Sequence, residues 1–331
     1  MSIHSILGSG RRSVAVAAAL TVGLATAGAA AAAESPPSAS VTGDTLTVIG
    51  SSEADHIALR LAAGEPNTLQ VDFDDDGSSD QSFDRSTFSN IAVILGRGDD
   101  QFRVDQINGT FIDEALTVDG GSGDDTIAGG DGNEALLGGI GRDSIDGNRG
   151  SDSASLGAGD DSFTWDPGDG SDAVDGSDGI DALVFNGANL SEIMSLSASG
   201  DHTVFLRDIG TIRMDLDFVE TLDLHALGGA DEVTINDTTG TGFRQANLDL
   251  GSQGGGDGAA DLVTVNGTAG DEKIKVDAHG AEVDVDGFAA ETSITGSETT
   301  DQLQVNGQGG SDSLRVDDGV RALIGVAVDL T

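Results

Sequence analysis

The chain has 331 residues, of which 58 are acidic and 15 are lysine or arginine, so its formal net charge is −43 at pH 7. Binding to nucleic-acid phosphates needs clustered basic side chains, and this charge therefore excludes a nucleic-acid partner. The 50 glycines follow no three-residue period, which excludes collagen, and the chain has no cysteine that could form a disulfide.

Residues 1–33 are predicted to be an export signal. Arg11 and Arg12 precede an apolar, alanine-rich stretch over 14–30, and small residues at 31–33 provide a cleavage site. The stretch is too weak for a permanent span, so we expect no integral membrane span after cleavage. The general secretory route is favoured, and the adjacent arginines leave the twin-arginine route open. We expect the protein to be secreted or associated with the cell surface.

Residues 34–44 form a polar lead-in, and residues 45–115 are predicted to be an N-terminal β-solenoid region. Short runs such as LTVIG and IAVIL alternate apolar and polar residues between glycine, asparagine and aspartate, which is typical of strands and turns. Only residues 188–196 show any helical periodicity. The chain is therefore predicted to be all-β.

The acidic segment DFDDDGSSD within this region has the spacing of a calcium loop. Asp72, Asp74, Asp76 and Asp80 occupy ligand positions, whereas Phe83 stands where an EF-hand carries its bidentate glutamate. The alternative is a β-hairpin turn whose acids only serve solubility. A hairpin could also carry the ion, so both interpretations stay open.

Between residues 120 and 164 the chain repeats every nine residues, as GGSGDDTIA, GGDGNEALL, GGIGRDSID, GNRGSDSAS and LGAGDDSFT. Glycines permit tight turns that direct carbonyl groups inward, the sixth position supplies an anionic oxygen, and the apolar eighth position points into a thin core. A flexible glycine-rich linker would not keep aspartate and apolar residues in register. Asn148 and Leu156 replace glycines, and we expect asparagine to tolerate a left-handed turn better than leucine does.

Two units would form one turn of a right-handed parallel β-coil, so acids 18 residues apart would stack. Calcium takes six to eight oxygen ligands, which two stacked carboxylates and glycine carbonyls would supply. Asp143 would serve two sites, and its loss should be the most harmful. The candidate metal ligands are Asp125, Glu134, Asp143, Asp152, Asp161, Asp172 and Asp181, with turn glycines Gly121, Gly123, Gly130, Gly132, Gly139 and Gly141.

These repeats resemble the RTX, or hemolysin-type, calcium-binding family. The resemblance implies a right-handed parallel β-roll over residues 116–187 that binds Ca²⁺, in a secreted bacterial calcium-binding protein. Degenerate β-coils are expected on both sides, with residues 188–331 forming a C-terminal β-solenoid region. An alternative explanation of the acidity is solubility at high salt.

The flanking regions repeat the pattern of an acid followed by alternating apolar residues. Asp55 aligns with Glu272, and related units surround Asp231 and Asp312. These acids either cap turns by accepting backbone hydrogen bonds or bind calcium. The final segment VRALIGVAVDLT is predicted to be a strand that caps the coil.

The sequence contains no enzyme signature. There is no H-E-x-x-H zinc helix and no G-x-S-x-G nucleophile elbow, and the two lysines alternate along one strand as Lys273 and Lys275. We expect a non-enzymatic calcium-binding solenoid whose folding is coupled to extracellular calcium. A calcium-dependent adhesin or envelope-layer component with a surface partner, and a polysaccharide-acting enzyme on a β-helix, are the alternatives. The oligomeric state stays open.

Overall fold

The computed structural model describes residues 35–252 and 254–331, and its strands form two sheets of 14 strands each. Sheet A contains, in spatial order, β1 (Ser38–Thr42), β2 (Thr45–Ile49), β6 (Asn90–Arg97), β8 (Ala115–Ser122), β10 (Ala135–Ile140), β12 (Ser153–Ala158), β14 (Ala173–Asp178), β18 (Ile212–Asp217), β17 (His202–Arg207), β16 (Ile193–Ser199), β20 (Glu232–Ile235), β22 (Leu262–Asn266), β26 (Gln302–Asn306) and β28 (Gly325–Asp329). Sheet B contains β27 (Ser313–Val316), β23 (Lys273–His279), β24 (Glu282–Asp286), β25 (Glu291–Thr295), β21 (Gln245–Asp249), β19 (Thr221–His225), β15 (Ala182–Asn186), β13 (Ser162–Trp165), β11 (Ser144–Asp146), β9 (Thr126–Ala128), β7 (Gln101–Asp105), β3 (His56–Ala62), β4 (Glu65–Asp72) and β5 (Gln81–Asp84). Three short 3₁₀ turns join them: η1 (Arg85–Thr87), η2 (Ile209–Thr211) and η3 (Val320–Ala322).

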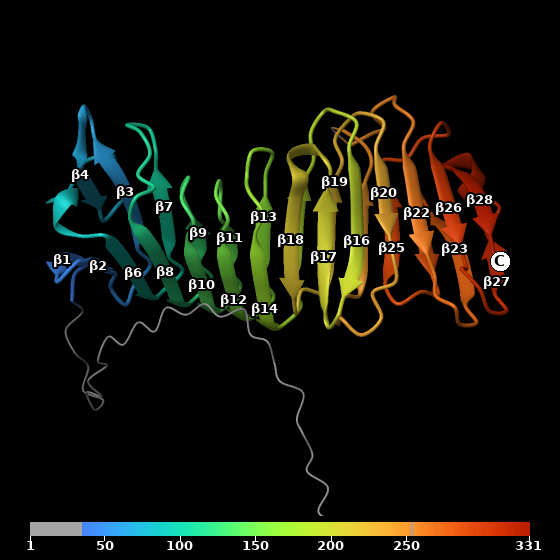
Figure 1. The fold of residues 1–331 in the computed structure, drawn as a ribbon, viewed down its shortest axis with the longest axis horizontal. Coiled ribbons are helices and arrows are strands. Elements are labelled where there is room, and N and C mark those ends of the chain that lie inside the picture. Colours follow the sequence, from blue (N-terminus) through green and yellow to red (C-terminus); the bar gives the residue numbers. More distant parts are fainter. Residues whose placement is uncertain (1–34, 253) are drawn as a thin grey trace, which may run out of the picture.

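Most strands of both sheets pair in parallel, and the chain passes back and forth between the sheets as it advances along an elongated coil (Figure 1). In the central repeats, Leu136 of β10 lies opposite Val118 on one side and Ala154 on the other. The strands β9, β11 and β13 have the same register in sheet B. Successive turns are therefore offset by 18 residues, which confirms that two nine-residue units make one turn. The predicted all-β architecture is likewise confirmed.

The core is a thin apolar layer between the two sheets. Central strands alternate buried and partly exposed residues, as expected when one face of each sheet meets the other sheet. Ile127, Ile145 and Phe163 project from sheet B, and each is at most 1% exposed. A buried aromatic stack continues this layer toward the C-terminal half: the rings of Trp165 and Phe185 are parallel, with centroids 4.1 Å apart.

Three antiparallel meanders interrupt the parallel coil. The strands β3, β4 and β5 form one at the N-terminal end of sheet B, β16, β17 and β18 form another within sheet A, and β23, β24 and β25 form the third within sheet B. The helical periodicity of residues 188–196 is misleading, because β16 begins at Ile193 and its alternate side chains are buried. Its apolar residues serve a strand with one buried face rather than a helix stripe.

Both ends of the coil carry added elements. At the N-terminal end β1 pairs antiparallel with β2, and at the C-terminal end β28 pairs in parallel with β26. Val320 of η3 and the following Ile324 are fully buried, so this segment covers the last turn of the core. The predicted terminal strand is therefore present, and a 3₁₀ turn assists it.

No helix in the described ranges has the length and apolar character needed to cross a bilayer. The predicted export signal at residues 1–33 lies outside the described residues.

Candidate metal site

Alternate acids of the central repeats, together with acids of the flanking turns, form a row along one edge of the coil, each one directly before a strand of sheet B. A carboxylate oxygen of each acid accepts the backbone N–H of the corresponding acid one turn earlier. We call this row the central ladder. Its bonds are Asp55 N to Asp100 Oδ1 (2.7 Å), Asp100 N to Asp125 Oδ1 (2.8 Å), Asp125 N to Asp143 Oδ1 (2.9 Å), Asp143 N to Asp161 Oδ1 (2.7 Å), Asp161 N to Asp181 Oδ1 (2.9 Å) and Asp181 N to Glu220 Oε2 (3.0 Å).

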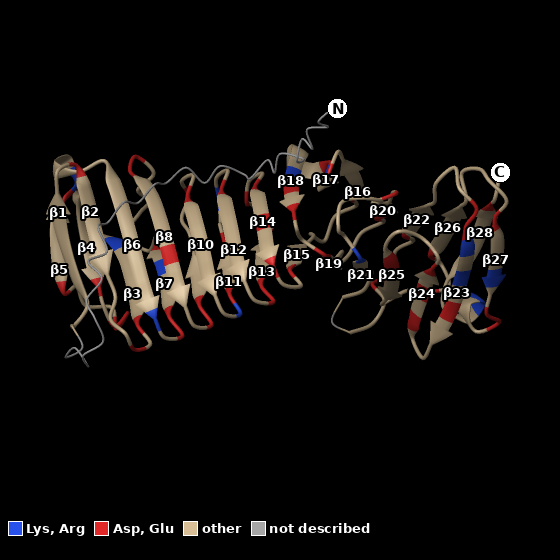
Figure 2. Cartoon of the chain, turned by 90° about the horizontal axis from the view of Figure 1, so that it is seen from below, with Lys and Arg blue, Asp and Glu red and all other residues tan. Residues whose placement is uncertain are grey.

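The opposite edge carries a second row before the strands of sheet A, the short ladder of Glu134, Asp152 and Asp172. The Glu134 N–H donates to Asp152 Oδ1 at 2.7 Å, and the Asp152 N–H donates to Asp172 Oδ1 at 2.8 Å. All seven acids predicted from the repeats therefore lie in these two ladders. Red turns along the edges of the coil in Figure 2 mark the acidic residues.

Most of the ladder aspartates use one oxygen in this way and bury the other. The Oδ2 atoms of Asp125, Asp143, Asp152, Asp161 and Asp181 are buried and have no hydrogen-bond partner. A buried carboxylate with an unsatisfied oxygen is unfavourable unless a proton or a cation compensates its charge. The ladders therefore present a line of oxygen atoms that lack a compensating group.

Glycine is required beside these oxygens for a steric reason. A Cβ on Gly120 would lie 2.6 Å from Asp125 Oδ2, and a Cβ on Gly138 would lie 2.6 Å from Asp143 Oδ2. Neither glycine has a positive φ. The first glycine of the repeat thus makes room for the carboxylate, rather than forming a left-handed turn.

The second and fourth glycines have the left-handed geometry that the repeat predicts. Gly121 and Gly123 have φ of 99° and 132°, and Gly139 and Gly141 have φ of 118° and 138°. A Cβ on Gly139 or Gly141 would overlap the carbonyl oxygen of Gly121 or Gly123 in the previous turn. Carbonyl oxygens of one turn therefore point along the coil toward the next turn.

The predicted ligands Gly130 and Gly132 differ from this pattern, since neither has a positive φ. The Gly130 N–H donates to Glu134 Oε2 at 2.9 Å, so the longer glutamate arm takes a backbone partner within its own unit. Leu156 does not adopt a left-handed conformation, so leucine is not tested in such a turn here. Leu156 occupies the first position of its unit, lies in strand β12 and is fully buried. Asn148 does adopt the left-handed region, with φ of 58°.

Burial and neighbouring charges raise the pKa of the ladder carboxyls. Burial is the larger cause in each case, and the nearby acids add to it. The pKa rises to about 7 at Asp125, to about 6 at Asp143, to about 9 at Asp152, and to about 7 at both Asp172 and Asp181. When these carboxyl groups are ionised, a cation is needed beside them to compensate their charge.

A further row of acids was not predicted from the sequence. Asp124 Oδ1 accepts the Arg142 N–H of the following turn at 2.8 Å, and Asp99 Oδ1 accepts the Asp124 N–H at 3.0 Å. In this outer row the later turn donates to the earlier one, whereas in the central ladder the earlier turn donates to the later one. The two adjacent acids of each G-D-D segment could have predicted this row, because one acid can accept a hydrogen bond from the turn before it and the other from the turn after it.

The acidic segment near Asp72 is a hairpin turn. Strands β4 and β5 pair antiparallel across it, and ligand atoms of Asp72, Asp74 and Asp80 lie within 4.8 Å of one another. Asp76 is not part of this cluster, and its Oδ1 accepts the Ser78 N–H at 2.7 Å. The buried Arg60 guanidinium contacts Asp72 at 2.8 Å, so a protein cation already compensates that carboxylate.

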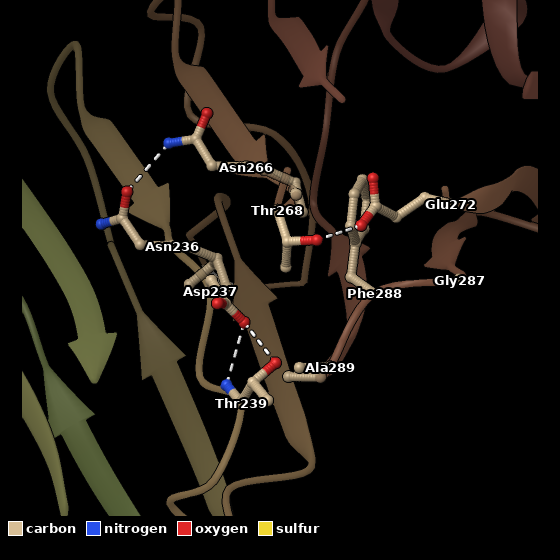
Figure 3. A pocket seen from close by; sticks show the side chains of 13 residues that line it. Asn236, Asp237, Thr239, Asn266, Thr268, Glu272, Gly287, Phe288 and Ala289 are labelled. Atoms are coloured by element: carbon tan, nitrogen blue, oxygen red, sulfur yellow. Dashed lines mark hydrogen bonds between the residues drawn. The ribbon is translucent and has the colours of Figure 1, made fainter. Parts of the chain in front are cut away.

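Two hollows lie outside the ladders. One, of about 220 Å³, lies where the β24–β25 hairpin meets the ends of β20 and β22, and Figure 3 shows its polar wall beside Phe288. There Asp237 accepts the Thr239 N–H at 2.9 Å, and the Thr268 hydroxyl donates to Glu272. The other hollow, of about 360 Å³, lies over β19, β21 and β25 of sheet B and includes His225. Ser293 lines this second hollow, and its hydroxyl donates to Asp284 Oδ1 at 2.7 Å.

We call the central ladder and the short ladder together the central block. Three features make it suitable for a calcium ion: its carboxylate oxygens are buried without partners, its glycines leave space that a side chain would fill, and its carbonyl oxygens point between turns. Hard oxygen donors of this kind are those that calcium prefers. No family model matches the chain, and no curated protein matches it significantly.

Proposed function

We propose that this protein is an exported, non-enzymatic calcium-binding solenoid whose coil forms when calcium binds between its turns. The observation that carries the proposal is the line of buried ladder oxygens without partners at Asp125, Asp143, Asp161 and Asp181. In the proposed sites, carboxylates of successive turns and glycine carbonyls hold the ion. Calcium supplies the positive charge that the ladders lack.

The net charge of −43 supports coupling between binding and folding. In the absence of divalent cations, repulsion between the acids favours an expanded chain, since packing the turns brings carboxylates together. An ion that binds only the folded coil adds its binding free energy to the free energy of folding. Millimolar calcium outside the cell would then drive folding after export.

The resemblance of the repeats to the RTX family and the predicted export signal support a location outside the cell. A structural or cell-surface role suits a protein whose binding groups serve its own turns. An adhesin or envelope-layer component would use the same calcium-dependent fold, and release from cells on chelation would favour that role. Activity on a polysaccharide would instead favour the enzyme alternative.

The test is far-UV circular dichroism of the full chain during a calcium titration from a chelated start, with magnesium as the control ion. We expect a cooperative gain of β signal that calcium produces and magnesium does not. Asp143→Asn should raise the calcium midpoint, while Asp318→Asn, which removes a charge from an exposed position, should leave it nearly unchanged. A fully folded chain in chelator, with no response to calcium, would contradict the proposal.

A further inference from the structure

A fourth row of acids lies in the C-terminal half, outside the nine-residue repeats. It consists of Glu192, Asp231, Asp261 and Asp301, which directly precede β16, β20, β22 and β26, and we call it the C-terminal ladder. The Glu192 N–H donates to Asp231 Oδ1 at 2.8 Å, Asp231 N–H to Asp261 Oδ1 at 2.8 Å, and Asp261 N–H to Asp301 Oδ1 at 3.1 Å. Gly229 occupies the fourth position of the repeat motif before Asp231, whereas Ala259 occupies it before Asp261. Figure 1 shows these strands side by side, from the yellow β16 to the darker orange β26.

At the two ends of the C-terminal ladder, Glu192 and Asp301, both carboxylate oxygens have hydrogen-bond partners. The Arg207 guanidinium donates to Glu192 Oε1, and both side chains are buried, so the protein supplies its own cation there. Glu192 Oε2 accepts the Ala188 N–H at 2.7 Å. At the other end, Asp301 Oδ2 accepts the Glu298 N–H at 2.6 Å.

The two middle acids are not compensated. Asp231 is 1% exposed and Asp261 is 3% exposed, and the Oδ2 atom of each is buried without a hydrogen-bond partner. Two more carboxylates lie beside them. Asp257 accepts the Gly229 N–H at 2.8 Å and its charge acts on both acids, and the charge of Glu298 acts on Asp261. In the described part of the chain, neither Asp231 nor Asp261 forms an ion pair with a Lys, Arg or His, and the same holds for Asp257, Glu298 and Asp301.

We propose that a divalent cation, with calcium as the best fit, binds between the turns that carry Asp231 and Asp261. The unpartnered oxygen of each acid is a ligand, and Asp257 adds negative charge around the ion. The contact of Arg207 with Glu192 shows that a cation can lie next to a buried carboxylate of this ladder. The middle of the ladder has no such side chain, and a hard metal ion with oxygen ligands takes that role. This site is separate from the central block.

The competing explanation is that these acids only cap turns. Asp261→Asn distinguishes turn capping from metal binding, because the amide oxygen of asparagine still accepts the Asp231 N–H while the negative charge is lost. The full chain is used, and two quantities are measured with calcium as the probe ion: ions bound per chain by equilibrium dialysis, and amide hydrogen exchange of β20 and β22 with and without calcium. Asp318→Asn is the control for loss of one charge.

We expect Asp261→Asn to bind one ion fewer per chain and to lose the calcium-dependent protection of β20 and β22, while the calcium response of β9 to β13 is kept. Asp231→Asn should behave in the same way, which guards against a folding defect peculiar to one variant. Unchanged ion number and unchanged protection in both variants would overturn the site and leave turn capping. Asp143→Asn reports on the central block separately, so failure of one proposal is distinguishable from failure of the other.

Discussion

The substitution Gly138→Ala tests whether the Asp143 carboxylate of the central ladder packs directly against Gly138. Gly138 does not have a positive φ, so alanine causes no left-handed backbone strain there. Its Cβ would lie 2.6 Å from Asp143 Oδ2 and would also overlap the Leu156 carbonyl oxygen of the next turn. Because the carbonyl belongs to the sheet backbone, relief of that clash needs a shift of β12 relative to β10, and relief of the other clash needs a movement of the Asp143 carboxylate. The carboxylate would then lose the Asp125 N–H and its place beside the proposed ion.

The expected cost combines two effects. Overpacking a tight site costs about 1–3 kcal/mol, and a hydrogen bond to a charged group contributes about 1.5–3 kcal/mol. With partial relaxation we expect a loss of about 3 kcal/mol in the free energy of unfolding, which is roughly 100-fold in the folding equilibrium. If about three ions bind together with folding, the calcium midpoint should rise about fivefold.

The assay is urea unfolding at fixed calcium together with the calcium midpoint from far-UV circular dichroism. Gly255→Ala is the matched control, since Gly255 also lacks a positive φ and no heavy atom lies within 4 Å of its added Cβ. If Gly138→Ala and Gly255→Ala differ by less than about 0.5 kcal/mol, the range of ordinary surface substitutions, the carboxylate is not seated against Gly138.

Three further outcomes follow from the ladders and the core. In chelator, the metal-free protein should gain stability as the pH falls from about 8 to about 5, because the folded pKa values of Asp125 (about 7) and Asp143 (about 6) exceed the ordinary aspartate pKa of 3.8. That stabilisation is complete below the unfolded pKa and is lost as the pH rises through the folded values, so a far-UV circular dichroism signal in chelator that stays constant from about pH 8 to about pH 5 would refute it. Arg207→Met should destabilise the protein by about 3–5 kcal/mol by leaving the buried Glu192 without its cation, and adding Glu192→Gln should restore part of the loss in a urea titration. Trp165 is fully buried, so its fluorescence should shift to shorter wavelength in step with the circular dichroism during a calcium titration, and two separate transitions would contradict a single cooperative coil.

The central turns were predictable because each position of the repeat has one physical task. Ile127 and Ile145 must face a core from very short strands, and Asp125 and Asp143 must lie at the same corner in consecutive turns. A nine-residue period fixes these relations without information from distant parts of the chain. Register and core followed directly from the spacing.

The meanders and the compensating arginines were not predictable in the same way. An antiparallel hairpin strand has the same alternation as a coil strand, so nothing distinguishes β17 and β24 beyond the turns at Gly200 and Gly280, where φ is 77° and 72°. The pairing of Arg207 with Glu192 depends on a meander that returns one strand beside another. Such contacts depend on the tertiary path of the chain rather than on local pattern.

The ladders also bear on how such a chain can change in length. The same backbone-to-carboxylate bond joins residues 18 apart at Asp125, 20 apart at Asp161, 39 apart at Glu192 and 45 apart at Asp55. Inserted residues loop out at the corners of the coil, and the chain then returns to form the same hydrogen bond. Each turn therefore keeps its position whatever the length of its insertion. Segments gained or lost between ladder acids therefore alter the outer surface and leave neighbouring turns intact. Diversification of this protein in evolution, or by design, has its natural sites at these corners.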